Sequence, residues 1–100
     1  MRLPHGSPVT VAGLVLNRQR PQTSQGITFV TLEDETAIAN LIIRLRTWQR
    51  YELAARRAAA LLVTGRLERK DRVVHVLATR LEDLASKVDV LVRVKSRDFH

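Results

Sequence analysis

The sequence predicts an all-β domain with one helix, folded as a five-stranded Greek-key barrel in the order strand, strand, strand, helix, strand, strand. The chain of 100 residues has room for one compact domain and not for two. Alternating patterns typical of strands fill most of it, and a helical period appears once, between residues 44 and 58. A helix placed there can close one end of a small barrel. A sheet-plus-helix sandwich also fits the pattern, but it fits the order of elements less well.

The first strand is predicted over residues 9–16, VTVAGLVL, with its valines on one face. Gly13 interrupts that face, and an isolated glycine inside a strand indicates a bulge or a sharp bend. Residues 17–26, NRQRPQTSQG, are predicted to form a polar loop.

A hairpin follows, with strands over residues 27–33 and 37–43 that meet at the acidic turn 34–36. Alternation divides the side chains of the second strand between two faces: Thr28, Val30 and Leu32 on one, and Ile27, Phe29 and Thr31 on the other. An exposed aromatic on such a hairpin suits a sheet that presents a face to a ligand. The alternative, with Phe29 packed inward and Leu32 outward, remains open.

The helix is predicted over residues 44–58, where Leu45, Trp48 and Ala55 recur at helical spacing. Trp48 and Tyr51 are expected to plug the barrel. The remaining elements are a strand over 59–67, a charged turn over 68–71, a strand over 72–80 and a closing segment to residue 86. We therefore divide the chain into a lead (residues 1–8), a barrel domain (9–86) and an extended tail (87–100), which could add an edge strand or order beside a partner.

The charge favours a polyanionic partner. Seventeen lysines and arginines stand against ten acidic residues, a formal net charge of +7, and fourteen of the cations are arginine. Such a surplus attracts nucleic acid first and anionic membrane second. The open alternative is an arginine-rich genome that encodes arginine wherever a solvated cation will serve.

Enzymatic and metal-binding patterns are missing from the sequence. There is no cysteine, which excludes a disulfide scaffold and a thiol nucleophile. No apolar run approaches the ~18 residues of a membrane span. His5, His75 and His100 lack metal-ligand spacing, and residues 33–35 are better explained as a solvated turn than as a metal cluster. No catalytic triad or glycine-rich phosphate loop is present. We expect no cofactor, no metal and no catalysis by these residues.

Several stretches together resemble one protein family. They are VTVAGLVLNRQRP, GITFVTLEDETAIANLII, VTGRLERKDRVVHVLATRLEDL and the ending SRDFH, and they cover nearly the whole chain. They are similar to the C-terminal OB domain of bacterial error-prone DNA polymerases, paralogues of the polymerase III alpha subunit. The resemblance implies an OB-fold of the nucleic-acid-binding, tRNA-anticodon-binding-like superfamily. It also implies a parent enzyme whose catalytic carboxylates lie upstream, so we expect a detached domain or a truncated reading frame.

Two positions depart from that family. Ala37 follows the acidic turn where the family usually has glycine, and Arg44 stands where the family tends to carry an aromatic. A residue other than glycine avoids positive φ, so the turn is expected to be reshaped.

Binding residues can be proposed from the chemistry of single-stranded nucleic acid, which is held by aromatic platforms and by cations along its phosphates. Phe29 is the candidate platform, and Asn40 could contact a base edge or phosphate or be a plain exposed amide. Cations of the two loops that flank one barrel face are expected to converge on the phosphate backbone of the nucleic acid. They are Arg18, Arg20, Arg69, Lys70 and Arg72. Arg69 and Lys70 could instead pair with neighbouring acids. The helix arginines are expected to form a solvated face.

The sequence thus predicts a non-catalytic, cytoplasmic module that binds single-stranded DNA for a translesion polymerase, with no membrane partner and no small-molecule substrate. The alternatives are a docking module for polymerase accessory proteins, through the barrel edge or the tail, and an OB domain that binds RNA or tRNA.

Overall fold

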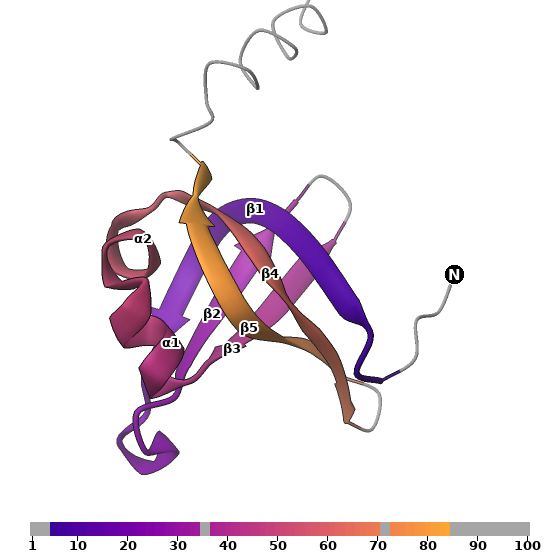
Figure 1. Cartoon of the computed structure of the whole chain (residues 1–100), viewed down its shortest axis with the longest axis horizontal. Coiled ribbons are helices and arrows are strands. Elements are labelled where there is room, and N and C mark those ends of the chain that lie inside the picture. The colour runs from indigo at the N-terminus through magenta and orange to yellow at the C-terminus, as the bar shows by residue number, and fades with distance from the viewer. Residues whose placement is uncertain (1–4, 35–36, 71–72, 85–100) are drawn as a thin grey trace, which may run out of the picture.

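Five strands close into a barrel in the order β1-β2-β3-β5-β4, in a computed structural model that describes residues 5–34, 37–70 and 73–84 (Figure 1). The strands are β1 (Pro8–Gln19), β2 (Thr28–Glu33), β3 (Ile38–Ile43), β4 (Ala60–Lys70) and β5 (Val73–Asp83). Neighbours pair antiparallel except β3 and β5, which run parallel because the helical segment carries the chain across the barrel. The predicted barrel and its order of elements are confirmed.

The core is aliphatic and fills the inside of the barrel. Its largest fully buried side chains are Leu32, Leu41, Ile43, Leu61, Leu81, Val30 and Val63. In β2 the predicted alternation holds, since Thr28, Val30 and Leu32 are buried while Phe29 is exposed. The valines of the first strand, Val9, Val11 and Val15, pack against the same core, as predicted.

The irregularity expected at Gly13 lies elsewhere. The register of β1 against β2 shifts between Val15 and Asn17, which places the bulge at Leu16. Gly13 serves a different purpose, because a Cβ there would lie 2.6 Å from the backbone oxygen of Glu33. The glycine therefore permits close approach of two strands at the point where β1 passes from β4 to β2.

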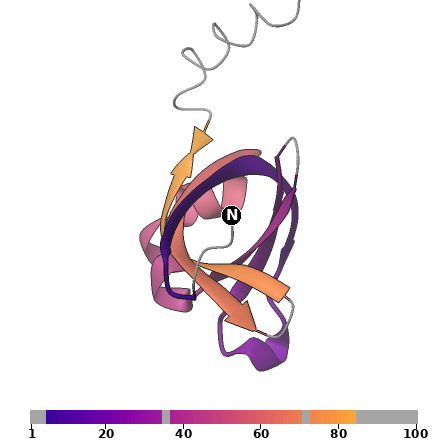
Figure 2. The same cartoon turned by 90° about the vertical axis from the view of Figure 1, so that its right-hand side faces the viewer.

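The helical segment is two short helices rather than one. α1 (Leu45–Arg50) and α2 (Glu52–Arg57) are separated at Tyr51, whose φ is −117° and ψ 33°. Backbone hydrogen bonds continue through this bend, because Tyr51 N–H donates to Thr47 and Ala55 N–H donates to Tyr51. Hydrogen bonding thus continues from α1 into α2 although the chain bends at Tyr51. Trp48, Tyr51 and Ala55 all pack in or against the core. Figures 1 and 2 show the two helices covering one end of the barrel.

Three strands are longer than the sequence indicated. β1 continues through residues 17–19, which were predicted as loop, because the bulge keeps the chain paired with β2 as far as Gln19↔Phe29. β4 continues to Lys70, so most of the predicted 68–71 turn is strand, and β5 continues to Asp83. Cross-strand pairing such as Glu68↔His75 outweighs the charged composition of this segment.

The structure also shows how the chain turns at the two ends of β2. Between β1 and β2 the chain forms a short 3-10 helix, η1 (Gln22–Ser24), with positive φ at Gln25 and Gly26. In the β2–β3 turn, Ala37 has no positive φ. Its N–H donates to the Asp34 carboxylate at 2.7 Å, so alanine is accommodated without strain. The tail 87–100 lies outside the described residues.

Candidate nucleic-acid interface

The outer surface of β2 and β3 is the candidate binding face. Residues opposite one another on paired strands project to the same side of a sheet. Because Val30 and Leu32 point into the core, the residues between them point outward. The resulting outward pairs on β2 and β3 are Phe29↔Ile42, Thr31↔Asn40 and Glu33↔Ile38.

Phe29 lies on this face with 38% of its surface exposed. Its cross-strand neighbours are Gln19 on β1 and Ile42 on β3. The alternative in which Phe29 packs inward and Leu32 outward is wrong, since Leu32 is 1% exposed. An outward aromatic on a half-buried surface is the arrangement in which a ring can stack on a flat ligand.

Asn40 belongs to a row of polar residues beside the Phe29 row. Register relates Asn17 on β1 to Thr31 on β2, Thr31 to Asn40 on β3, and Asn40 to His75 on β5. Asn40, Thr31 and His75 are half-buried. Nδ1 of His75 is buried and has no hydrogen-bond partner among the described residues. The face therefore offers amide, hydroxyl and imidazole groups next to one aromatic ring.

Arg18 does not lie in a loop, and its side chain is directed toward the helices. It pairs in register with the buried Val30, which places its side chain on the inner side of the sheet. Its Nε donates to the carbonyl oxygen of Ala55 at 2.7 Å, and its Nη2 donates to that of Ala58. Ala55 lies in the last turn of α2 and Ala58 is its C-cap residue, a position where a cation is favourable. These two donors attach the helical segment to the barrel.

Arg20 follows β1 and also contacts the helical segment. Its Nε donates to Thr28 Oγ1 at 2.9 Å. Its guanidinium carbon lies 4.8 Å from the centre of the Trp48 ring, a cation–π contact. Arg20 remains exposed and comes directly after Gln19, the neighbour of Phe29. Of the two cations predicted between the first strands, Arg20 is exposed and Arg18 is half-buried.

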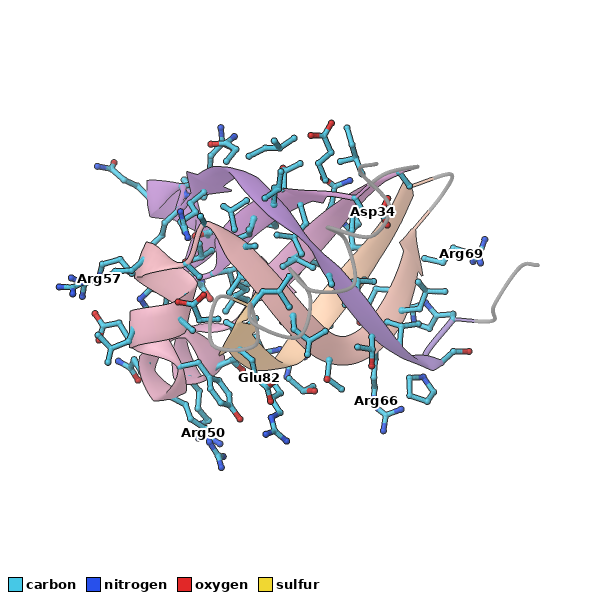
Figure 3. The ribbon with its side chains drawn as sticks, turned by 90° about the horizontal axis from the view of Figure 1, so that it is seen from above. Asp34, Arg50, Arg57, Arg66, Arg69 and Glu82 are labelled. Carbon is cyan, nitrogen blue, oxygen red and sulfur yellow. The ribbon has the colours of Figure 1, made fainter. Side chains whose placement is uncertain are left out.

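The cations predicted at the β4–β5 connection lie at the other end of the barrel. Arg69 and Lys70 are the last residues of β4, paired in register with residues 74 and 73, and Arg72 lies outside the described residues. The backbone N–H of Arg69 donates to His5 Nδ1 at 2.9 Å. Figure 3 shows Arg69 far from the helices that carry Arg50 and Arg57. The structure therefore places Arg20 and Arg69 toward opposite ends of the barrel, and these two predicted cations do not come together at one point.

Sequence reasoning missed part of this surface. Gln19, Ile42 and His75 neighbour the predicted Phe29 and Asn40 through register alone. Arg44 follows β3 two residues after Ile42, is exposed and has extended backbone angles (φ −68°, ψ 155°). The only sequence signal for these neighbours was alternation within each strand, which does not reveal pairing between strands.

Other kinds of site find no support in the described part of the chain. No three histidine or acidic residues there are grouped so that they could hold a metal ion. None of the described helices is long and apolar enough to cross a membrane.

Comparison with known proteins agrees with this architecture. Residues 9–84 match the family model described as "OB-fold nucleic acid binding domain". Because the match covers most of the chain, the protein belongs to this OB-fold family.

Within that class, the chain resembles error-prone DNA polymerases. It is 50% identical over 98 residues to the enzyme of Rhodopirellula baltica, covering 98% of this chain and 8% of the relative. It is 48% identical over 99 residues to the enzyme of Pseudomonas aeruginosa, covering 99% of this chain and 10% of the relative. The resemblance drawn from the sequence is confirmed. The chain spans about a tenth of the length of these curated relatives.

Solved structures show the same fold at low identity. Asparaginyl-tRNA synthetase from Pyrococcus horikoshii matches with a TM-score of 0.65 and 21% identity, over 78% of this chain and 20% of that one. A chain of the S. pombe Stn1–Ten1 complex matches with a TM-score of 0.66 and 12% identity, over 93% of this chain and 78% of that one. At these identities the likeness establishes the fold alone.

Proposed function

We propose that this chain is a non-catalytic module that binds single-stranded DNA on the outer face of β2 and β3, as part of an error-prone polymerase. The observation that carries the proposal is the outward Phe29, 38% exposed beside the polar row of Asn40. Family membership, the formal charge of +7 and the similarity to error-prone polymerases all support it.

In the proposed complex, a base stacks on Phe29 and polar groups of the Asn40 row contact its edge or the neighbouring sugar. Stacking on an aromatic side chain is worth about 1–3 kcal/mol per base. Phosphates are contacted by Arg20 toward one end of the barrel and by Arg69 toward the other, with Lys70 and Arg72, close to Arg69 in the sequence, as further predicted contacts. Arg18 contributes indirectly, because its donors hold the helical segment beside Arg20.

The test is a titration of the chain with fluorescently labelled single-stranded DNA, single-stranded RNA and duplex DNA over a range of salt concentrations. Binding to single strands should weaken steeply with salt, because counterions are released when phosphates are neutralised. Equal and weak binding to all three probes would refute the proposal. Tighter binding to RNA than to DNA would replace DNA with RNA as the ligand.

Phe29 is tested by substitution. Phe29→Ala should weaken single-strand binding about 5- to 150-fold, since about 1.4 kcal/mol corresponds to a factor of ten. Phe29→Tyr keeps a ring and should bind as the original does. Ile38→Ala is a control, because it removes an exposed apolar side chain (58% exposed) from another position on the face. An equal loss in the Ile38 and Phe29 variants would contradict stacking. Thermal melts must show that Phe29→Ala still folds.

A second candidate function is docking of a polymerase accessory protein. The observation that favours it is the exposure of Leu14 (57%), Leu16 (52%) and Ile38 (58%), all large aliphatic side chains on β1 and β3. Substituting the three by serine should abolish capture of such a partner and leave single-strand binding intact. Loss of nucleic-acid binding with retained capture would exclude this role for the three residues.

A further inference from the structure

The two helices and the residues that flank them, residues 44–58, carry a concentration of positive charge that has no role in the contacts proposed above. We call this segment the helical cap. It contains five arginines and a single acidic residue, Glu52, a net of four positive charges. Glu52 forms an ion pair with Arg56, four residues later on the same helix. The single acid therefore neutralises a neighbour within the cap and leaves the other arginines uncompensated.

Three of the remaining arginines are exposed and have no polar partner in the part of the chain that the structure describes. Within the described residues, Arg44, Arg46 and Arg57 form neither an ion pair nor a side-chain hydrogen bond, and all three are exposed. Arg50 lies 5.7 Å from the centre of the Tyr51 ring and is also exposed. Figure 3 shows Arg50 and Arg57 extending away from the barrel. By contrast, Arg18 donates to the carbonyl oxygens of Ala55 and Ala58, and Arg20 donates to Oγ1 of Thr28.

The cap is continuous with the face that carries Phe29. Ile42 is the cross-strand partner of Phe29, and Arg44 follows it by two residues in extended backbone. Two residues of extended backbone span about 6.6 Å, so the side chain of Arg44 leaves the backbone about that distance beyond the side chain of Ile42. Arg20, stacked on Trp48 of α1, lies on the same border. A bound nucleic-acid strand that runs from Phe29 toward the helices therefore meets Arg44 first and α1 next.

From these observations we propose that the helical cap is a second phosphate-binding surface, along which Arg44, Arg46 and Arg57 hold the backbone of the strand bound at Phe29. Arg46 and Arg57 are eleven residues apart, which is at most about 16 Å along a helix. A surface of this length can meet more than one phosphate of a bound single strand. The inference extends the proposed function and rests on it.

The test compares two double variants that lose the same charge. Arg46→Gln with Arg57→Gln removes cations from the cap. Arg66→Gln with Arg80→Gln is the control for lost charge, because both arginines are exposed on β4 and β5, strands that do not neighbour β2 in the barrel. Arg66 donates to the carbonyl oxygen of Gly6 and Arg80 pairs with Glu82, so thermal melts must show that this variant still folds. Each variant is titrated with a single-stranded DNA of about 4 nucleotides and with one of about 16, the range of sites seen for OB folds.

The cap variant should bind the long oligonucleotide about 25-fold more weakly at 0.1 M salt. This figure follows from two lost contacts, each worth about 0.7 in the slope of log K against log salt for single strands. Its affinity for the short oligonucleotide should not change, and the control pair should affect neither probe beyond about twofold.

Unchanged binding of the long probe by the cap variant would overturn the inference, as would equal losses in the cap and control variants or an equal loss for both probe lengths. A parallel titration uses vesicles that contain anionic lipid, and a loss seen only with these vesicles would also overturn it. Failure of the proposed function is distinguishable, because then Phe29→Ala would leave binding of the short probe unaltered.

Discussion

Replacing Arg18 by methionine separates a structural role for this arginine from a role in phosphate binding. The perturbation removes the two guanidinium donors that reach the carbonyl oxygens of Ala55 and Ala58 at the end of α2. Methionine keeps the straight aliphatic stem, so the packing of the stem on the inner side of β1 is largely retained.

The magnitude follows from these contacts. Hydrogen bonds from a charged group contribute about 1.5–3 kcal/mol each. Because Arg18 is half-buried, water screens part of that contribution and the lower values apply. We expect a loss of about 2–3 kcal/mol in the free energy of unfolding. For a domain of this size that corresponds to a fall in Tm of about 10–20 °C.

The assay is urea denaturation followed by the fluorescence of Trp48, the single tryptophan of the chain, which packs against the core. Arg46→Met is the matched control. It loses the same charge from an exposed side chain and should change stability by less than about 0.5 kcal/mol. An Arg18→Met variant as stable as this control, but with weakened single-strand binding, would refute the structural role and return Arg18 to the phosphate contacts.

Three further predictions test the barrel and one of its turns. Gly13→Ala should destabilise the domain by about 1–3 kcal/mol in a thermal melt, because the added Cβ lies 2.6 Å from the Glu33 backbone oxygen; an unchanged Tm would show that β1 and β2 can separate there without cost. Leu41→Ala should cost about 2–5 kcal/mol in urea denaturation, since the side chain is 0% exposed. Leu53→Ala, at a position 74% exposed, should cost almost nothing, and similar losses at both sites would contradict the assigned core. Asp34→Ala should lower stability by about 1 kcal/mol through the lost hydrogen bond to the turn, whereas Asp34→Asn should retain most of it.

The sequence alone determined the class of fold and how the side chains of its hairpin divide between two faces, while the structure showed which of the two faces is buried. Alternation has a period of two, so burial of Val30 and Leu32 obliges Phe29 to point outward. A single change to helical period located the helices, and their apolar residues Trp48 and Ala55 do pack against the core. Local pattern was sufficient for these features because each depends on residues a few positions apart.

Only the tertiary structure decided where strands end and what the arginines do. Strand ends depend on partners distant in sequence, such as Glu68↔His75, whose pairing carries β4 through a charged segment that looked like a turn. The same holds for the cations. In composition Arg18 and Arg46 are equivalent, yet the first reaches the carbonyl of Ala55, 37 residues away, while the second is exposed on α1. Charge is a property of the residue, whereas its availability to a ligand depends on which acceptors the fold brings within reach.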